Sequence, residues 1–446
     1  MPRRLDYPAA VAALRSRGRF GISLGLERVD AILDRLDRPD RRLRGALIAG
    51  TNGKGSVVAL VRATLNAAGL RVGTMPKPHL VSYRERIAVD GEPLSEAAFA
   101  DAVERVLPAV DDVAERLGPP TEFEVLTAAA FAELARAEVD LAVVEVGMGG
   151  RLDATNVLDP GVAAVTNVAL DHERYLGHTL AAIGTEKAAI IKAENLAVTG
   201  ASGRGLRPIL DRCADLAVPL RRAGPRQPYR ASVRDAGWDG LVLDARAGAR
   251  ELDELHLALL GSHQAGNAAV ALAVLDALGQ DGERRGSLLG VDDGAIRRGF
   301  ATVRWPGRME LLRSTSVGPV LLDGAHNPAG ARALAAALDE LGLRRFPLVF
   351  GAMRGKRVSA VLRALAPLRP RPVFADVPDR GAHTAGELLH AWRPIGRGGR
   401  AEPVLERALA EAAALRRGAD QPVVVAGSLY LVGAVRGMLL GERSEA

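Results

Sequence analysis

The stretch Gly50-Thr51-Asn52-Gly53-Lys54-Gly55-Ser56 lies between a short apolar run, residues 46–49, and a segment rich in Ala, Val and Leu, residues 57–68. The glycines therefore fall where a buried strand would lead into a helix. Glycine lets the backbone approach an anion closely, and the first N–H groups of a helix have no partner within it. Lys54 adds a positive charge for the outer phosphates, and the Ser56 hydroxyl can bind Mg²⁺. The stretch predicts a phosphate-binding loop.

This stretch departs from the usual P-loop spacing, G-x-x-x-x-G-K-[ST]. Ile48 occupies the first glycine position, and Gly55 separates the lysine from the hydroxyl. A glycine-rich turn without a ligand is the alternative. The occurrence of Gly, Lys and Ser together between a strand and a helix favours phosphate binding.

The length and composition of the chain limit its class. A chain of 446 residues that is 48% hydrophobic is too long for one core, so we expect two domains in a soluble protein. No apolar run approaches the roughly 18 residues of a membrane helix, and the N-terminus shows no signal-peptide segment. The single cysteine, Cys213, cannot form an internal disulfide, which favours the cytoplasm. The net charge of +6 comes from scattered arginines with only 4% aromatic residues, so an anionic small substrate or an arginine-rich proteome explains it better than nucleic acid. We expect neither nucleic acid nor a membrane as partner.

Lysine is rare in this chain. Of the 59 basic residues only five are lysines, namely Lys54, Lys77, Lys187, Lys192 and Lys356. An amine can lose its proton and a guanidinium cannot, so these lysines are candidates for sites that need a compact ammonium or a neutral amine. Chance retention is the alternative. It suits Lys192 and Lys356 better than Lys54 and Lys187, which lie inside dense motifs.

Further candidate residues follow two apolar runs. Residues 141–144 lead directly into Glu145, and residues 162–166 are soon followed by Asp171-His172. Carboxyl ends of parallel strands form a ligand-binding edge, so Glu145 can support Mg²⁺ there. A single histidine is usually an ordinary packed or surface residue, but its place beside an acid favours metal binding for His172. Lys187 lies in a predicted helical turn and has two open states, an ammonium or a carbamate that binds Mg²⁺.

Alternation of strands and helices resumes late in the chain. Apolar runs at 319–322, 348–350, 372–375 and 422–426 are each tied to a helix or loop, after a linker at Trp305-Pro306-Gly307-Arg308. We predict an α/β protein with a P-loop-type parallel-sheet domain, residues 1–303, and a Rossmann-like C-terminal domain, residues 304–446.

With these residues assembled, the chain resembles the folylpolyglutamate synthase/dihydrofolate synthase family of the Mur ligase superfamily almost from end to end. The matching motifs are Leu24 to Val29, Gly50 to Ser56, Pro78-His79-Leu80 with Glu85-Arg86-Ile87, Glu145 to Val157, Leu170-Asp171-His172, Glu186-Lys187-Ala188, His263-Gln264 with Asn267, Gly307-Arg308, Asp323 to Pro328, and Gly427-Ser428. The resemblance implies a cytoplasmic ATP-dependent ligase, expected to be monomeric. Such an enzyme joins glutamate to dihydropteroate or to the γ-carboxylate of a folate through an acyl phosphate.

The resemblance also implies roles for individual residues. For ATP these are Asn52, Gly53, Lys54 and Gly55 at the phosphates, with Asn267, Arg308 and Asp323 as further contacts. For Mg²⁺, expected as two ions, they are Ser56, Glu145, His172 and a carbamate on Lys187. For the pterin they are Leu24, Gly25, Leu26, Thr121, Glu122, Phe123 as a stacking ring, Glu124, Leu152, Asp153 and Ala154. Lys77 and His79 are also assigned to the substrate site, and His326 and Ser428 to the incoming glutamate.

Three positions depart from the family pattern. Lys77 stands where the family typically has a serine that binds the metal, and an ammonium has no lone pair to give. Either water takes that coordination position while Lys77 touches a phosphate, or the metal arrangement and the pterin substrate differ. Arg357 stands where the family often has an acid, and Leu47 where it often has His.

Two other functions remain open from the sequence. A peptidoglycan-precursor ligase of the same superfamily would share the ATP site. A P-loop NTPase switch or nucleotide-binding regulator would use ATP without needing Arg308 or Asp323.

Overall fold

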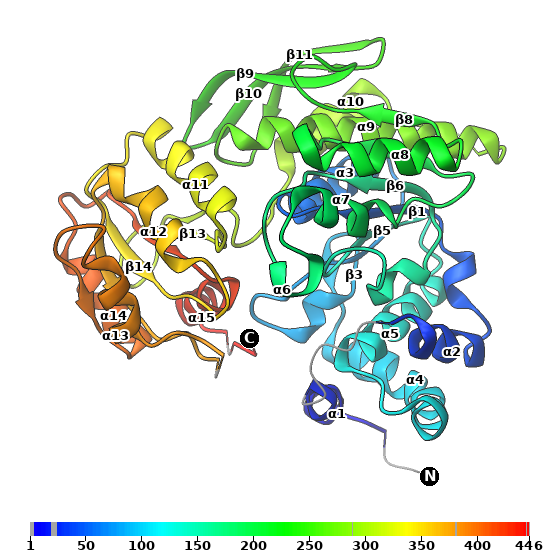
Figure 1. Ribbon diagram of the computed structural model, residues 1–446, viewed down its shortest axis with the longest axis horizontal. Coiled ribbons are helices and arrows are strands. Elements are labelled where there is room, and N and C mark those ends of the chain that lie inside the picture. Colours follow the sequence, from blue (N-terminus) through cyan, green and yellow to red (C-terminus); the bar gives the residue numbers. More distant parts are fainter. Residues whose placement is uncertain (1–3, 19–24, 288, 380, 443, 446) are drawn as a thin grey trace.

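The computed structural model describes residues 4–18, 25–287, 289–379, 381–442 and 444–445. Two α/β bodies lie side by side, the first running from blue to green and the second from yellow to red (Figure 1). In the described ranges, no helix combines the length and apolarity that crossing a bilayer requires.

An eight-stranded sheet forms the centre of the N-terminal domain, in the order β4-β3-β2-β5-β1-β6-β7-β8. Strands β2, β5, β1, β6, β7 and β8 are parallel, and β3 and β4 form an antiparallel edge. The strand bounds are β1 Gly45–Ala49, β2 Val72–Met75, β3 Ala88–Val89, β4 Glu92–Pro93, β5 Leu141–Glu145, β6 Gly161–Val165, β7 Leu196–Thr199 and β8 Leu220–Arg222. The central strand β1 thus leads directly into the predicted phosphate-binding loop.

Helices cover both faces of this sheet. Alternate residues of β1 point to opposite faces, with Leu47 and Ala49 in one core and Ala46 and Ile48 in the other. The first core takes α1 Tyr7–Gly18, α2 Glu27–Arg35, α4 Glu96–Leu117, α5 Glu122–Arg136 and α8 Arg207–Asp215. The second takes α3 Lys54–Ala67, α9 His263–Arg284, α10 Asp293–Thr302 and an antiparallel sheet of β9 Tyr229–Gly237, β10 Gly240–Ala247 and β11 Arg250–Leu257. Two short helices, α6 Glu173–Leu176 and α7 Leu180–Ala188, follow β6.

A six-stranded sheet in the order β12-β13-β17-β14-β15-β16 forms the C-terminal domain, parallel except at β12. Its strands are β12 Glu310–Leu312, β13 Val320–Asp323, β14 Pro347–Phe350, β15 Arg371–Phe374, β16 Arg400–Ala401 and β17 Val423–Ala426. Its helices are α11 Pro328–Glu340, α12 Val358–Leu365 and α13 Ala385–Trp392 in one core, and α14 Leu405–Ala414 and α15 Leu429–Leu440 in the other. The predicted α/β fold with two parallel sheets is confirmed.

Two local features of the fold affect the site. Residues 121–124 form the cap and first turn of α5, because Thr121 and Glu124 bond to each other's backbone N–H groups in a capping box. The predicted linker contacts the phosphate-binding loop, since a Cβ atom on Gly55 would lie 2.6 Å from the Trp305 ring. The linker therefore packs against the site as well as joining the domains.

Candidate active site

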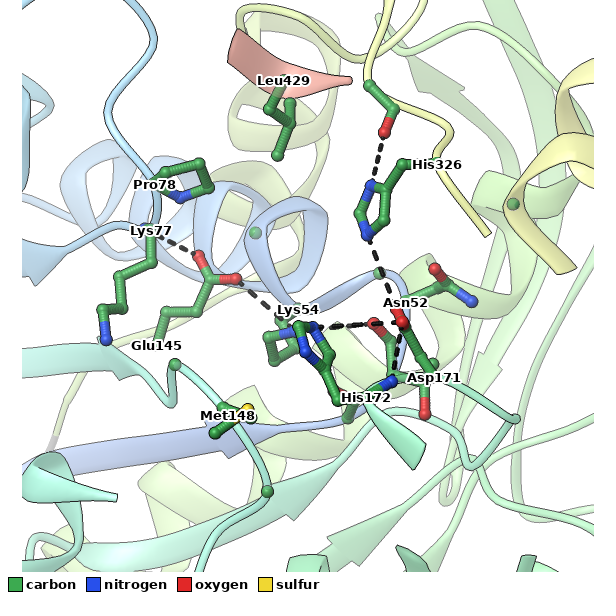
Figure 2. Close-up of a pocket in the computed structure, with 18 of the residues that line it drawn as sticks. Asn52, Lys54, Lys77, Pro78, Glu145, Met148, Asp171, His172, His326 and Leu429 are labelled. Atoms are coloured by element: carbon green, nitrogen blue, oxygen red, sulfur yellow. Dashed lines mark hydrogen bonds and ion pairs between the residues drawn. The ribbon is translucent and has the colours of Figure 1, made fainter. Parts of the chain in front are cut away.

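A cavity of about 730 Å³ lies between the two domains. The N-terminal domain contributes residues 50–56, the α5 start and Glu145 to its wall, and the C-terminal domain contributes residues 323–326 and 427–430. Figure 2 shows Lys54, Glu145, Asp171 and His326 converging on this space. Parts of a single site thus come from both domains.

Residues 50–53 are held in place by the residues that follow β6. Asn167 accepts a hydrogen bond from the Asn52 N–H at 3.0 Å through Oδ1 and donates one to the Asn52 carbonyl at 2.8 Å through Nδ2. Thr166 donates to the same carbonyl at 2.6 Å. Gly53 has φ of 80°, and a Cβ atom there would collide with the Asn267 amide, so this position requires glycine. The loop is preformed, with the N-terminus of α3 opening into the cavity.

Lys54 and Glu145 form a buried charge pair beneath the loop. The Lys54 Nζ atom donates to the Gly50 carbonyl at 3.1 Å and lies 3.9 Å from Glu145 Oε1. Burial lowers the pKa of Lys54 and raises the pKa of Glu145, and the attraction between them opposes both shifts. Glu145 Oε2 accepts the Lys77 N–H at 3.2 Å (Figure 2). A cation bound beside Glu145 would compensate the buried carboxylate.

The side chains predicted for Mg²⁺ suit that ion in their chemistry. Ser56 and Glu145 are buried and offer oxygen atoms to the cavity. Burial, with repulsion from Lys356, lowers the pKa of His172 to about 4, so the imidazole is neutral at pH 7 and has a lone pair to give. Within the described residues, no group of three or more His, Cys, Asp or Glu side chains is arranged around a metal position. The candidate set therefore depends on Ser56 and Lys187 as well.

Lys187 lies at the end of α7, buried against the cavity. In the part of the chain that the structure describes, its amine makes no hydrogen bond or ion pair. Burial, with repulsion from Lys54, lowers the pKa of Lys187 to about 7. A substantial fraction of this amine is unprotonated at neutral pH, which the carbamate alternative requires.

Asp171 connects the two domains. Its carboxylate accepts hydrogen bonds from Lys356 Nζ at 2.7 Å and Asn327 Nδ2 at 3.0 Å, and His326 Nε2 lies 3.5 Å away. Burial alone would raise the pKa of Asp171, but the His326 hydrogen bond and the Lys356 charge hold it well below its usual range. Asn327 also donates to Asn52 Oδ1 at 2.9 Å, and Arg357 pairs with Glu173 at 2.7 Å. We refer to Asp171, His326, Asn327 and Lys356 as the interdomain cluster.

We expect Asp171 and Lys356 to be strongly coupled energetically. Their side chains are only 8% and 18% exposed, so removing one leaves the other charge poorly solvated. A double-mutant cycle of Asp171→Asn and Lys356→Met on urea unfolding should give a coupling free energy of about 1 to 3 kcal/mol. The Arg357–Glu173 pair, with Arg357 56% exposed, is the control and should give less than about 1 kcal/mol. Equal coupling in the two cycles would contradict the importance assigned to the cluster.

A second part of the cavity wall comes from the start of α5 and the turn after β5. Predicted residues that line it are Gly25, Thr121, Glu122, Phe123, Glu124, Leu152, Asp153 and Ala154. Glu124 is occupied by its cap and by Arg28, and Glu122 accepts the Tyr83 hydroxyl at 2.9 Å. Asp153 accepts the Met148 N–H at 2.8 Å and so shapes the turn after β5. Phe123 is the aromatic ring of this wall.

Some predicted site residues do not reach the cavity. His79 is buried, stacks on Tyr83 and accepts a hydrogen bond from Arg86 at 2.9 Å, so it supports Arg86, which lines the cavity. Leu26 precedes α2 and is also away from the cavity wall, and Leu24 lies outside the described residues. Asn267, Arg308, Asp323, His326 and Ser428 all line it.

Two cavity residues, Asp171 and Lys356, have no role in the sequence prediction. Asp171 belongs to a motif in which only its neighbour His172 is assigned, and for Lys356 the rarity of lysine is the available signal. Asn327 of the interdomain cluster caps α11, and the predicted ATP contact Asp323 accepts the N–H groups of Met309 and Ala325 at 3.0 and 2.9 Å.

The arrangement of two α/β domains around a phosphate-binding loop agrees with comparisons to known families. Residues 48–275 match the Mur ligase middle domain, and residues 307–429 match the Mur ligase glutamate ligase domain. Fold and site thus define an ATP-dependent ligase of the Mur type. The nucleotide-switch alternative is not supported.

Individual relatives narrow this class. The chain is 31% identical to the dihydrofolate synthase/folylpolyglutamate synthase of Bacillus subtilis, covering 96% of this chain and 98% of the relative. Folylpolyglutamate synthase of Mycobacterium tuberculosis, solved with ADP and AMPPCP, superposes with a TM-score of 0.87 at 34% identity, over 97% of this chain and 99% of that one. FolC of Escherichia coli, solved with DHPP and ADP, gives 0.84 at 31% identity over the full length of both. The chain belongs to the folylpolyglutamate synthase/dihydrofolate synthase family.

Proposed function

We propose that this ligase joins L-glutamate to dihydropteroate, to the γ-carboxylate of a folate, or to both, through an acyl phosphate. The observation that carries the proposal is the shared cavity: the phosphate-binding loop and the Phe123 wall line one space, which the C-terminal domain closes on the other side. An acid bound along that wall would present its carboxylate to a phosphate held at the loop. A relative solved in complex with both DHPP and ADP supports the proposal.

Direct amide formation from a carboxylate is slow because the carboxylate oxygen is a poor leaving group. Attack of the carboxylate oxygen on the γ-phosphorus of ATP releases ADP and gives an acyl phosphate, whose leaving group is phosphate. The amine of glutamate then attacks the acyl carbon, phosphate departs, and the amine loses a proton. Catalysis in such a sequence consists mainly of positioning the reactants and neutralising negative charge.

The residues of the loop would perform that neutralisation. Asn52, Gly53, Lys54 and Gly55 lie where backbone N–H groups and one ammonium can bind the ATP phosphates. Arg308, from the C-terminal domain, lines the same space and would add a second positive charge. Asn267 and Asp323 would contact the rest of the nucleotide.

Metal binding is assigned to Ser56, Glu145, His172 and Lys187. Two Mg²⁺ ions there would supply charge neutralisation on the phosphates. We propose that the Lys187 amine adds CO₂, forming an N–C bond and releasing one proton, and so becomes a carbamate. Its burial, its lowered pKa and its lack of a partner among the described residues support this assignment.

The remaining assignments concern substrates and organisation. The pterin would lie along the Phe123 wall, and the incoming glutamate near His326 and Ser428. We propose a domain boundary at residue 304, supported by the separate family matches at 48–275 and 307–429. One chain supplies all of these groups, which supports a monomer, and the single buried Cys213 supports the cytoplasm.

The assay that tests this function is ADP release with 7,8-dihydropteroate, and separately with tetrahydrofolate, each with and without glutamate. We expect glutamate-dependent ADP release with at least one of the two acids. Activity with dihydropteroate would indicate dihydrofolate synthesis, and activity with tetrahydrofolate would indicate polyglutamylation. ADP release that does not depend on the added acid or on glutamate would overturn the proposal. ADP release only with a peptidoglycan precursor would show that the enzyme is a peptidoglycan-precursor ligase.

A further inference from the structure

The ammonium of Lys77 rests on the aromatic ring of Phe123. The Nζ atom lies 2.6 Å from the ring centroid, and both side chains line the cavity. Such a contact is a cation–π interaction, and it occupies the surface on which a flat ligand ring would stack. Lys77 therefore covers the surface on which a ligand ring would stack.

This ammonium has no stronger partner among the described residues. The Asp153 carboxylate lies near it beside Gly147, and its Oδ2 accepts the Met148 N–H at 2.8 Å while its Oδ1 accepts the Thr155 N–H at 3.1 Å. No hydrogen bond or ion pair joins Lys77 Nζ to any described side chain. The Asp153 carboxylate is thus near Lys77 but is already used by two backbone N–H groups, so the ammonium can also bind an anion brought by a ligand.

Lys77 contacts both parts of the site, Glu145 through its backbone and Phe123 through its side chain. Its backbone N–H donates to Glu145 Oε2, and Glu145 Oε1 lies 3.9 Å from Lys54 Nζ at the phosphate-binding loop. In Figure 2 its side chain runs from this point away from Lys54. An acid with its ring on Phe123 and its carboxylate near Lys54 must therefore pass alongside Lys77.

We propose that Lys77 is a specificity-determining residue for the acid substrate. A flat ring displaces the ammonium from Phe123, and the ammonium then binds the carboxylate that is to be phosphorylated. The inference rests on the proposed function, and it names the recognised chemistry: an aromatic ring system carrying an ionised carboxylate. The ammonium would hold the carboxylate in place until its oxygen attacks the γ-phosphorus of ATP.

Equilibrium binding of pteroate and of its neutral methyl ester tests this role. Affinities are measured by calorimetry on the full-length protein with Mg²⁺ and a non-hydrolysable ATP analogue. The variant Lys77→Met keeps the length and apolar contact of the side chain and removes its charge. Lys192→Met is the matched control, because the Lys192 ammonium bonds to Asn156 and the Leu158 carbonyl and does not line the cavity.

The wild-type protein and Lys192→Met should bind the acid at least about 10-fold more tightly than the ester. Lys77→Met should weaken binding of the acid by about 10-fold or more and leave the ester unchanged, so that the preference disappears. If Lys77→Met kept the preference for the acid, or lost affinity equally for acid and ester, the role of Lys77 would be overturned. The proposed function is tested separately, and glutamate-dependent ADP release would still support it. If neither compound bound the wild-type protein, the pterin assignment of the cavity would fail instead.

Discussion

Replacing Lys54 with alanine should lower kcat for glutamate-dependent ADP release by at least about 10³-fold. Lys54 is the cation that the structure holds inside the phosphate-binding loop, fixed by the Gly50 carbonyl and by Glu145. A preorganised positive charge at a transferring phosphate contributes mainly to the transition state, so its loss appears in kcat. The variant also leaves the buried Glu145 carboxylate without its cation, so kcat is measured on protein whose folding has been checked by circular dichroism.

Arg62 provides the matched control for this prediction. It lies on the same helix, α3, but its guanidinium is directed to the Asp90 carbonyl and does not line the cavity. We expect Arg62→Ala to retain turnover within about threefold of the wild type. Near-normal turnover of Lys54→Ala would refute the role of the loop, whatever the result for Arg62.

Replacing Lys187 with alanine should reduce turnover by at least about 10²-fold, and short carboxylic acids such as acetate should partly restore it. The alanine variant leaves a space where a carbamate would lie, and a small carboxylate can supply the missing oxygen atoms. Turnover is measured against acetate and propionate concentration at fixed ionic strength. Lys54→Ala treated in the same way is the control and should show no rescue.

The covalent state of Lys187 can be checked independently of turnover. At saturating bicarbonate, the wild-type protein should carry the extra mass of one CO₂, and Lys187→Ala should not. If the wild-type protein lacks that mass and acetate fails to rescue the variant, Lys187 acts as an ammonium. That was the other state left open by the sequence.

The phosphate-binding loop was predictable because its determinants are local. Residues 46–68 contain the buried strand, the start of the helix and the glycine that the positive φ at position 53 requires. The parallel sheets followed in the same way from short apolar runs. The start of α5 is encoded locally as well, by the capping box of Thr121 and Glu124.

Contacts between distant residues were not predictable. Asp171 meets Lys356 across 185 positions of sequence, and nothing near either residue indicates the pairing. The same holds for Lys77 on Phe123, where the sequence showed only that a lysine replaces an expected serine. His79 was assigned to the substrate because of its motif, and the structure shows that it acts on Arg86.

The most direct test of the acyl-phosphate mechanism is an isotope-transfer experiment with ¹⁸O. Dihydropteroate labelled with ¹⁸O in its carboxylate is converted with ATP, Mg²⁺ and glutamate, and the released phosphate is analysed by mass spectrometry. If the acid is activated as an acyl phosphate at the loop, each phosphate formed should contain one ¹⁸O atom from the acid. Phosphate free of the label, formed while the amide product accumulates, would contradict the account.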